Sequence, residues 1–178
     1  MTLELDLYEQ AVIARLQPIK TALIDSGIPI ALLPRKAYAL GELEETGHIA
    51  IAFPDSSGDL DRSISHPISK QLATVSVEVK ISLSDRYNLN PELAEATVTW
   101  ALEQIIGLMT LYKLPVKRVK DCLLFSGHQL YAPKDNRWEA MARFVFDVWI
   151  VSTGVIESDP PITQVTGTDD QGVLFVAQ

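Results

Sequence analysis

The stretch LATVSVEVKISLS, residues 72–84, decides the fold. Its apolar and polar side chains alternate, which is the two-residue period of a strand with one face toward a core and the other toward water. The apolar set is Val75, Val77, Val79, Ile81 and Leu83. About twelve residues at roughly 3.3 Å each span about 40 Å, so we expect a long strand that bends or projects beyond a small core.

A helix with clear boundaries is predicted after this strand. Asn90 can cap its N-terminus, and Pro91 suits the first helical position. Glu92 and Glu95 then lie in the first turn, where the helix dipole favours negative charge. Apolar residues continue at helical spacing for about 22 residues, until Pro115. The predicted stripe comprises Leu93, Val98, Ala101, Leu102, Ile105, Leu108, Met109 and Tyr112.

Downstream, the sequence predicts a long β-hairpin. LLFSGHQLYAP forms one arm with a possible bulge at Gly127, KDNR forms the turn, and WEAMARFVFDVWIVSTG forms the other arm. In the second arm one face carries Ala142, Phe144, Phe146, Val148 and Ile150. Arg143, Asp147 and Trp149 point the other way.

Upstream, an amphipathic helix is predicted from about Leu5 to Ile24. Asp6 and Glu9 have the spacing of a capping box, and Gly27 suits the C-terminal end. Pro18 predicts a kink near residues 14–18 or a helix that restarts there. Residues 28–70 contain too many prolines and glycines for a long helix, so we expect short strands at 28–33 and 48–53 and a surface loop at 54–67.

Together these elements predict an α+β fold: an antiparallel β-sheet with two long helices packed on one face, plus a C-terminal extension. The α+β domain covers residues 1–154, and residues 155–178 form a linker and a strand-like arm. The arm is apolar at Val173, Leu174, Phe175 and Val176. It either pairs with its own sheet or adds as a strand to a neighbouring subunit.

The sequence offers no catalytic, cofactor-binding or metal-binding residues, so we expect no enzyme and no cofactor. The single cysteine, Cys122, lies beside an apolar run and is expected to be buried, and Gly-rich phosphate loops are absent. The acidic cluster Asp55, Asp59 and Asp61 lacks the spacing of a calcium-binding loop. The three histidines lack metal-ligand spacing; they are His48, His66 and His128.

The chain is acidic, with 15 Lys and Arg against 23 Asp and Glu and a net charge of −8, which disfavours general DNA binding. We find neither a signal peptide nor a membrane span and expect a cytosolic protein or a soluble assembly. One basic segment, KLPVKRVKD, stands out: it either complements a helix C-terminus or contacts an acidic partner or nucleic acid. Its cations are Lys113, Lys117, Arg118 and Lys120.

The N-terminal helix, the strand TVSVEVKIS, the helix NPELAEATVTWALEQIIGLMTLYKL and the hairpin with DNRWEAMARFVFDVWIV together resemble tail terminator or tail-completion proteins of long-tailed bacteriophages of lambda or Mu type. The resemblance covers roughly residues 3–152 and rests on the order and length of the elements. Similar proteins also serve contractile injection systems. The tail after Gly154 and the long loop at 54–70 depart from the family's compact pattern.

The resemblance implies a structural virion protein that assembles in the host cytoplasm. It implies a hexameric ring that caps the tail tube, ends its polymerisation and joins the tail to the head connector. The partners would be copies of the chain, the tube, sheath and connector proteins, and DNA only as cargo through the ring. The resemblance carries no residue-level site.

Two alternatives remain. One is another neck or baseplate component of a phage-like tail, with the same arrangement of elements. The other, from a different class, is a small-molecule-binding domain in which helices on a sheet enclose an apolar pocket. Trp100, Trp138 and Trp149 could line such a pocket, or they could serve core or interface packing.

Overall fold

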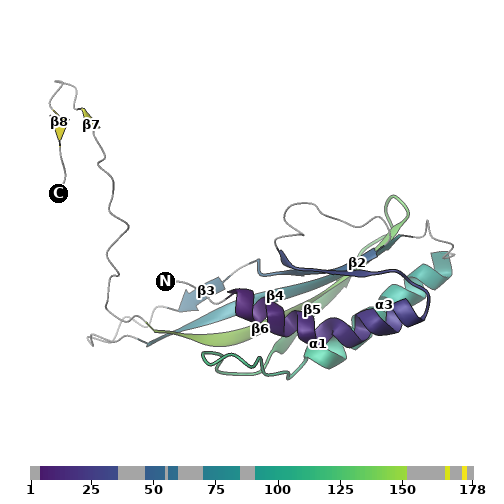
Figure 1. Ribbon diagram of the computed structural model, residues 1–178, viewed down its shortest axis with the longest axis horizontal. Helices are drawn as coiled ribbons and strands as arrows, with labels where there is room; N and C mark the ends of the chain where they lie inside the picture. The colour runs from purple at the N-terminus through teal and green to yellow at the C-terminus, as the bar shows by residue number, and fades with distance from the viewer. Residues whose placement is uncertain are drawn as a thin grey trace.

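The computed structural model describes residues 5–35, 47–54, 56–59, 70–84, 91–151, 167–168 and 174–175. Two helices, α1 and α3, pack on one face of a six-stranded sheet (Figure 1). The elements in chain order are α1 (Leu5–Asp25), β1 (Ala31–Leu33), β2 (Gly47–Ala52), β3 (Ser56–Asp59), β4 (Lys70–Ser84), α3 (Pro91–Met109), β5 (Leu124–Leu130), β6 (Arg137–Val151), β7 (Gly167–Thr168) and β8 (Leu174–Phe175).

The sheet is built around β4 and β6, which are antiparallel and paired from Lys70↔Val151 to Ser84↔Arg137. Both strands are 15 residues long, so β4 is longer than the expected twelve or so residues and β6 is the long arm that the sequence predicts. The strand order is β1-β2-β4-β6-β5, and β3 pairs with β4 on the same edge as β2. The α+β class is therefore correct, but the sheet is mixed because β1 runs parallel to β2. The expected loop at 54–67 is also wrong in part, since it contains β3.

The core lies between this sheet and the helices. The alternating apolar residues of β4 and β6 face it, including Val77, Ile81, Phe144 and Phe146, and all four are buried. On the helix side, Tyr8 of α1 meets Phe146 edge-on, with ring centroids 5.2 Å apart. Burying a large apolar side chain contributes roughly 1.5 to 3 kcal/mol, so this interlayer contact is a main source of stability.

The N-terminal helix α1 ends at the predicted glycine, but its first turn lacks the predicted capping box. Gly27 has φ 81°, its N–H donates to Ile24 O at 2.9 Å, and the Ile28 N–H donates to Leu23 O at 2.9 Å. This is a Schellman motif, which requires the left-handed conformation that glycine tolerates. The predicted capping box is wrong. The buried carboxylate of Glu9 accepts a hydrogen bond from the backbone N–H of Arg35, and the helix continues through Pro18.

The second helix begins at Pro91 as predicted, whereas its proposed cap Asn90 lies outside the described residues. It ends at Met109, several residues before Pro115. Leu111 adopts φ 59° and its N–H donates to Leu123 O at 2.8 Å, so tertiary pairing with the segment before β5 ends the helix. Leu93, predicted to be in the apolar stripe, is exposed.

The C-terminal hairpin forms as predicted. The turn residues Asp135 and Asn136 have φ 50° and 61°, the pair of positive values that a type I′ turn requires. The β5–β6 register shifts between Phe125 and Gly127, which confirms the bulge. Arg143 and Trp149 are exposed on the face away from the helices, as expected.

Two glycines give a matched test of this packing. A Cβ at Gly47 would lie 2.7 Å from Leu83 Cδ2 and 3.1 Å from Ser82 O, and Leu83 is buried. Gly47→Ala should therefore lower the free energy of unfolding by about 1 to 3 kcal/mol. A Cβ at Gly107, inside α3, meets nothing within 4 Å. Gly107→Ala should raise stability by about 0.5 to 1 kcal/mol. Urea unfolding of both variants measures this, and equal effects would contradict the close approach at Gly47.

Candidate interaction surfaces

The basic segment follows α3 as an extended loop rather than a helix end. Its backbone is bound to the far end of β6: the Lys120 N–H donates to Asp147 O at 2.9 Å, and the Trp149 N–H donates to Arg118 O at 2.8 Å. Leu114 and Val119 are buried and anchor the loop. All four cations are exposed and form what we call the basic surface: Lys113, Lys117, Arg118 and Lys120.

The helix-end interpretation of these cations is wrong. The last turn of α3 contains no basic residue, and Lys113 lies beyond the turn that follows it. Instead, Arg15 of α1 donates from Nε to Leu108 O at 2.9 Å, and its guanidinium lies 4.7 Å from the centroid of the Tyr112 ring. A cation from another helix thus complements the C-terminal end of α3.

The basic surface borders an apolar hollow and an aromatic ring. Neither neighbour was predicted from the sequence. Lys117 and Arg118 line a surface hollow of about 590 Å³ together with Leu7 and Ala11 of α1. The Lys120 ammonium lies 5.9 Å from the centroid of the exposed Trp149 ring and 3.5 Å from Asp121. Of these groups, exposed tryptophan and arginine are the side chains that are enriched in protein interfaces.

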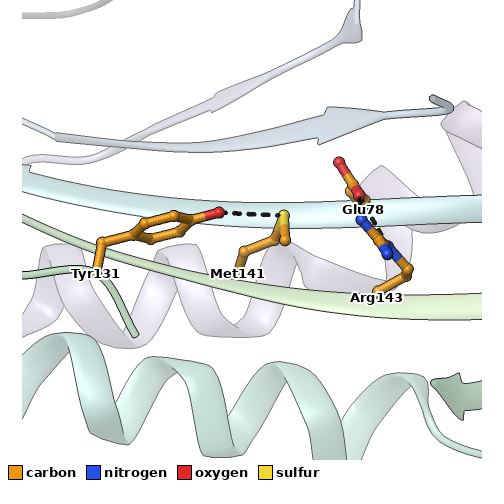
Figure 2. Close-up of polar contacts among 4 residues, drawn as sticks. All are labelled: Glu78, Tyr131, Met141 and Arg143. Atoms are coloured by element: carbon orange, nitrogen blue, oxygen red, sulfur yellow. Dashed lines mark hydrogen bonds and ion pairs between the residues drawn. The ribbon is translucent and has the colours of Figure 1, made fainter. Parts of the chain in front are cut away.

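The sheet face opposite the helices carries paired charges. Arg143 donates to Glu78 across β6 and β4 (Figure 2). On the same face, the Lys80 ammonium lies 2.7 Å from the Glu139 carboxylate. Figure 2 also shows the Tyr131 hydroxyl directed at Met141 Sδ, 3.8 Å away. Half-exposed pairs of this kind contribute at most about 1 kcal/mol each. Both pairs join β4 to β6 across the strand ladder.

Unlike these half-exposed charged side chains, His48 is buried. It pairs with Ser82 in the β2–β4 ladder, and its Nδ1 atom has no hydrogen-bond partner in the part of the chain that the structure describes. The pKa of His48 is lowered from 6.5 to about 4, first by burial and then by the nearby cations Arg137 and Lys80, against the opposing effect of Glu139. His48 is therefore neutral at physiological pH.

The other residues considered for chemistry do not converge. Within the described ranges, no group of three or more His, Cys, Asp or Glu residues could hold a metal ion. Cys122 is half-buried, so the expected full burial is wrong. His128 is exposed and stacks on Phe125, with centroids 6.0 Å apart. His66, Asp55 and Asp61 lie outside the described residues, as does the side chain of Asp59.

The three tryptophans do not share a pocket. Trp138 and Trp149 lie eleven residues apart on β6, a separation of roughly 35 Å. Trp100 lies on α3, where it borders a hollow of about 380 Å³ between α3 and the end of α1. The other contributors to this hollow are mainly apolar: Ala22, Leu23, Ser26, Ile28, Leu93, Ala96 and Thr97.

The C-terminal arm forms a small sheet of its own. In β8, Leu174 pairs with Thr168 and Phe175 with Gly167 of β7. The described part of the arm therefore does not pair with the main sheet, and Val173 and Val176 lie outside the described residues.

The sequence matches no protein-family model and no curated protein.

Neither α1 nor α3 has the length and apolar character needed to cross a membrane.

Proposed function

We propose that this chain is a structural subunit of a phage-like tail, acting as a tail terminator. Copies of the chain form a closed ring, a hexamer, which caps the tail tube, ends its polymerisation and joins the tail to the head connector. The role needs no catalysis and no cofactor. The ring would belong to the virion tail or neck, with DNA passing through it only as cargo.

One observation carries this proposal: a continuous 15-residue β4–β6 ladder backed on one face by two long helices, in the element order that the family resemblance requires. Strands of this length exceed the usual five or six residues. The exposed apolar and basic groups around the ladder supply surfaces for neighbouring subunits and for acidic tube or connector proteins.

The proposal is tested by assembly. Light scattering coupled to size exclusion should give a mass near six copies at high concentration, and electron microscopy should show sixfold rings with a central opening. The same protein, added to a tail tube protein that polymerises, should stop tube growth at a defined length. A chain that stays monomeric both alone and with the tube protein would contradict the proposal.

The apolar hollow beside Trp100 supports one alternative from another class, a small-molecule-binding domain. A neck or baseplate component remains an alternative with the same assembly behaviour. Oligomeric state and thermal stability with ligand distinguish a small-molecule-binding domain from a tail protein. A binding protein would be monomeric and would gain thermal stability with an apolar ligand, and Trp100→Ala would abolish that gain.

A further inference from the structure

Strand β5 forms an open edge of the main sheet. One side of β5 pairs with β6, and no described strand pairs with its other side. Its apolar side chains are exposed, with Leu124 at 52%, Phe125 at 38% and Leu130 at 55%. An edge strand presents unpaired N–H and C=O groups and is therefore a template for another strand.

The sequence of β5 does little to protect this edge. Its seven residues, LFSGHQL, include no Lys, Arg, Asp, Glu or Pro, the residues that usually block strand addition. The opposite edge, β1, is three residues long and is followed by Pro34, so it is blunted. The bulge before Gly127 divides β5 into two short runs, so its edge suits only a short partner strand.

Strand β8 has the properties of that partner. Leu174 and Phe175 belong to GVLFVAQ, which contains no charged residue and no proline. Their only strand partner in the described chain is the two-residue β7. A hairpin this small buries too little apolar surface to be stable in water. Strand β8 is therefore an apolar segment whose backbone has only this small pairing within the described residues.

The linker lets β8 reach a neighbouring subunit. Residues 152–166 separate β6 from β7. Fifteen residues span at most about 50 Å when extended. A compact domain of roughly 150 residues has a radius of gyration of about 15 Å, so the arm can extend beyond its own subunit.

We propose that β8 of one copy adds as a strand to the β5 edge of a second copy. This inference rests on the proposed ring and identifies its subunit contact. Each subunit donates one arm and accepts one, and such a head-to-tail contact closes into a ring when the rotation between copies allows it. Backbone hydrogen bonds supply the affinity, while Leu130, in the run of β5 after the bulge, contacts the side chains of the incoming strand.

Paired cysteines test the contact directly in the full-length chain. In a Cys122→Ser background, one preparation carries Leu130→Cys and the other carries Leu174→Cys or Phe175→Cys. Mixing them under mild oxidation should give a disulfide-linked dimer of the two different chains. Leu111→Cys, also exposed but outside the β5 edge, is the matched control and should give less than a tenth of that product. Equal cross-linking of Leu111→Cys and Leu130→Cys would overturn the proposal.

Charged substitutions test the energetic role of the contact. Leu130→Lys on the acceptor and Phe175→Asp on the donor should each weaken self-association, with a dissociation constant Kd at least ten times higher. Leu111→Lys should leave this Kd unchanged. Circular dichroism checks that each variant is folded. Rings that form equally well in both variants would overturn this inference and leave the proposed ring intact. Absence of rings in the unmodified chain, even with tube protein, would instead contradict the proposed function.

Discussion

Phe146→Ala should destabilise the fold by about 3 to 5 kcal/mol, the usual effect of removing a buried aromatic side chain from a core. Phe146 is buried on β6 and meets the Tyr8 ring edge-on at 5.2 Å, so its loss opens a cavity between the sheet and α1. The total stability of a domain is about 5 to 15 kcal/mol, so the variant loses a large fraction of it. For a chain of this size the melting temperature should fall by roughly 10 °C or more.

Phe125→Ala is the matched control, because it removes the same side chain from the open edge. Phe125 contacts Phe144 with ring centroids 5.9 Å apart but remains 38% exposed. Its substitution should reduce stability by no more than about 1 to 2 kcal/mol. Chemical denaturation of the monomeric protein at low concentration provides the comparison. A similar loss in both variants would show that the core does not extend between α1 and β6 as described.

Acid should destabilise the protein partly through His48. The pKa of His48 is lowered from 6.5 to about 4 in the folded protein, first by burial and then by Arg137 and Lys80. Between these two values the unfolded chain binds a proton that the folded protein does not. Stability contributed by neutral His48 is therefore fully present above about pH 6.5 and is lost as pH falls toward 4. Between pH 7 and pH 4.5 the loss should be about 2 kcal/mol.

His48→Gln tests this contribution because glutamine does not titrate. The difference in unfolding free energy between pH 7 and pH 4.5 should shrink by about 2 kcal/mol in this variant. His128→Gln, which changes an exposed histidine on β5, should retain the full dependence of the unmodified chain. Carboxylates affect both variants alike, so the comparison isolates His48. An unchanged pH dependence in His48→Gln would show that His48 is not held neutral by its surroundings.

Local sequence patterns predicted the main elements because their causes are local. The alternation through Val77 and Ile81, the helix start at Pro91 and the position of the turn at Asp135 and Asn136 each depend on residues close in sequence. Gly27 ended α1 for the same reason, since only its own backbone conformation was needed. The position of the bulge at Gly127 was equally local.

The incorrect sequence predictions concern residues whose partners in the folded protein lie far away in the sequence. Arg35 takes the Glu9 carboxylate that the capping box would use, and pairing with Leu123 stops α3 before Pro115. The apolar runs of β1 and β2 predict two strands, but they do not specify whether the strands pair in parallel or antiparallel. That direction depends on the connection between the two strands. The exposure of Leu93 likewise depends on where α1 ends beside α3.

The sequence by itself therefore determined the elements of this protein and the chemistry of its basic and apolar segments. Only the tertiary structure decided what those segments face. Folding leaves the cations of the basic surface exposed at the end of β6, brings Trp149 beside Lys120, and leaves β5 at an open edge. The physical reason is that hydrophobic period and turn preference act over a few residues, whereas the neighbours of a surface are set by which strands pair and which faces the helices cover.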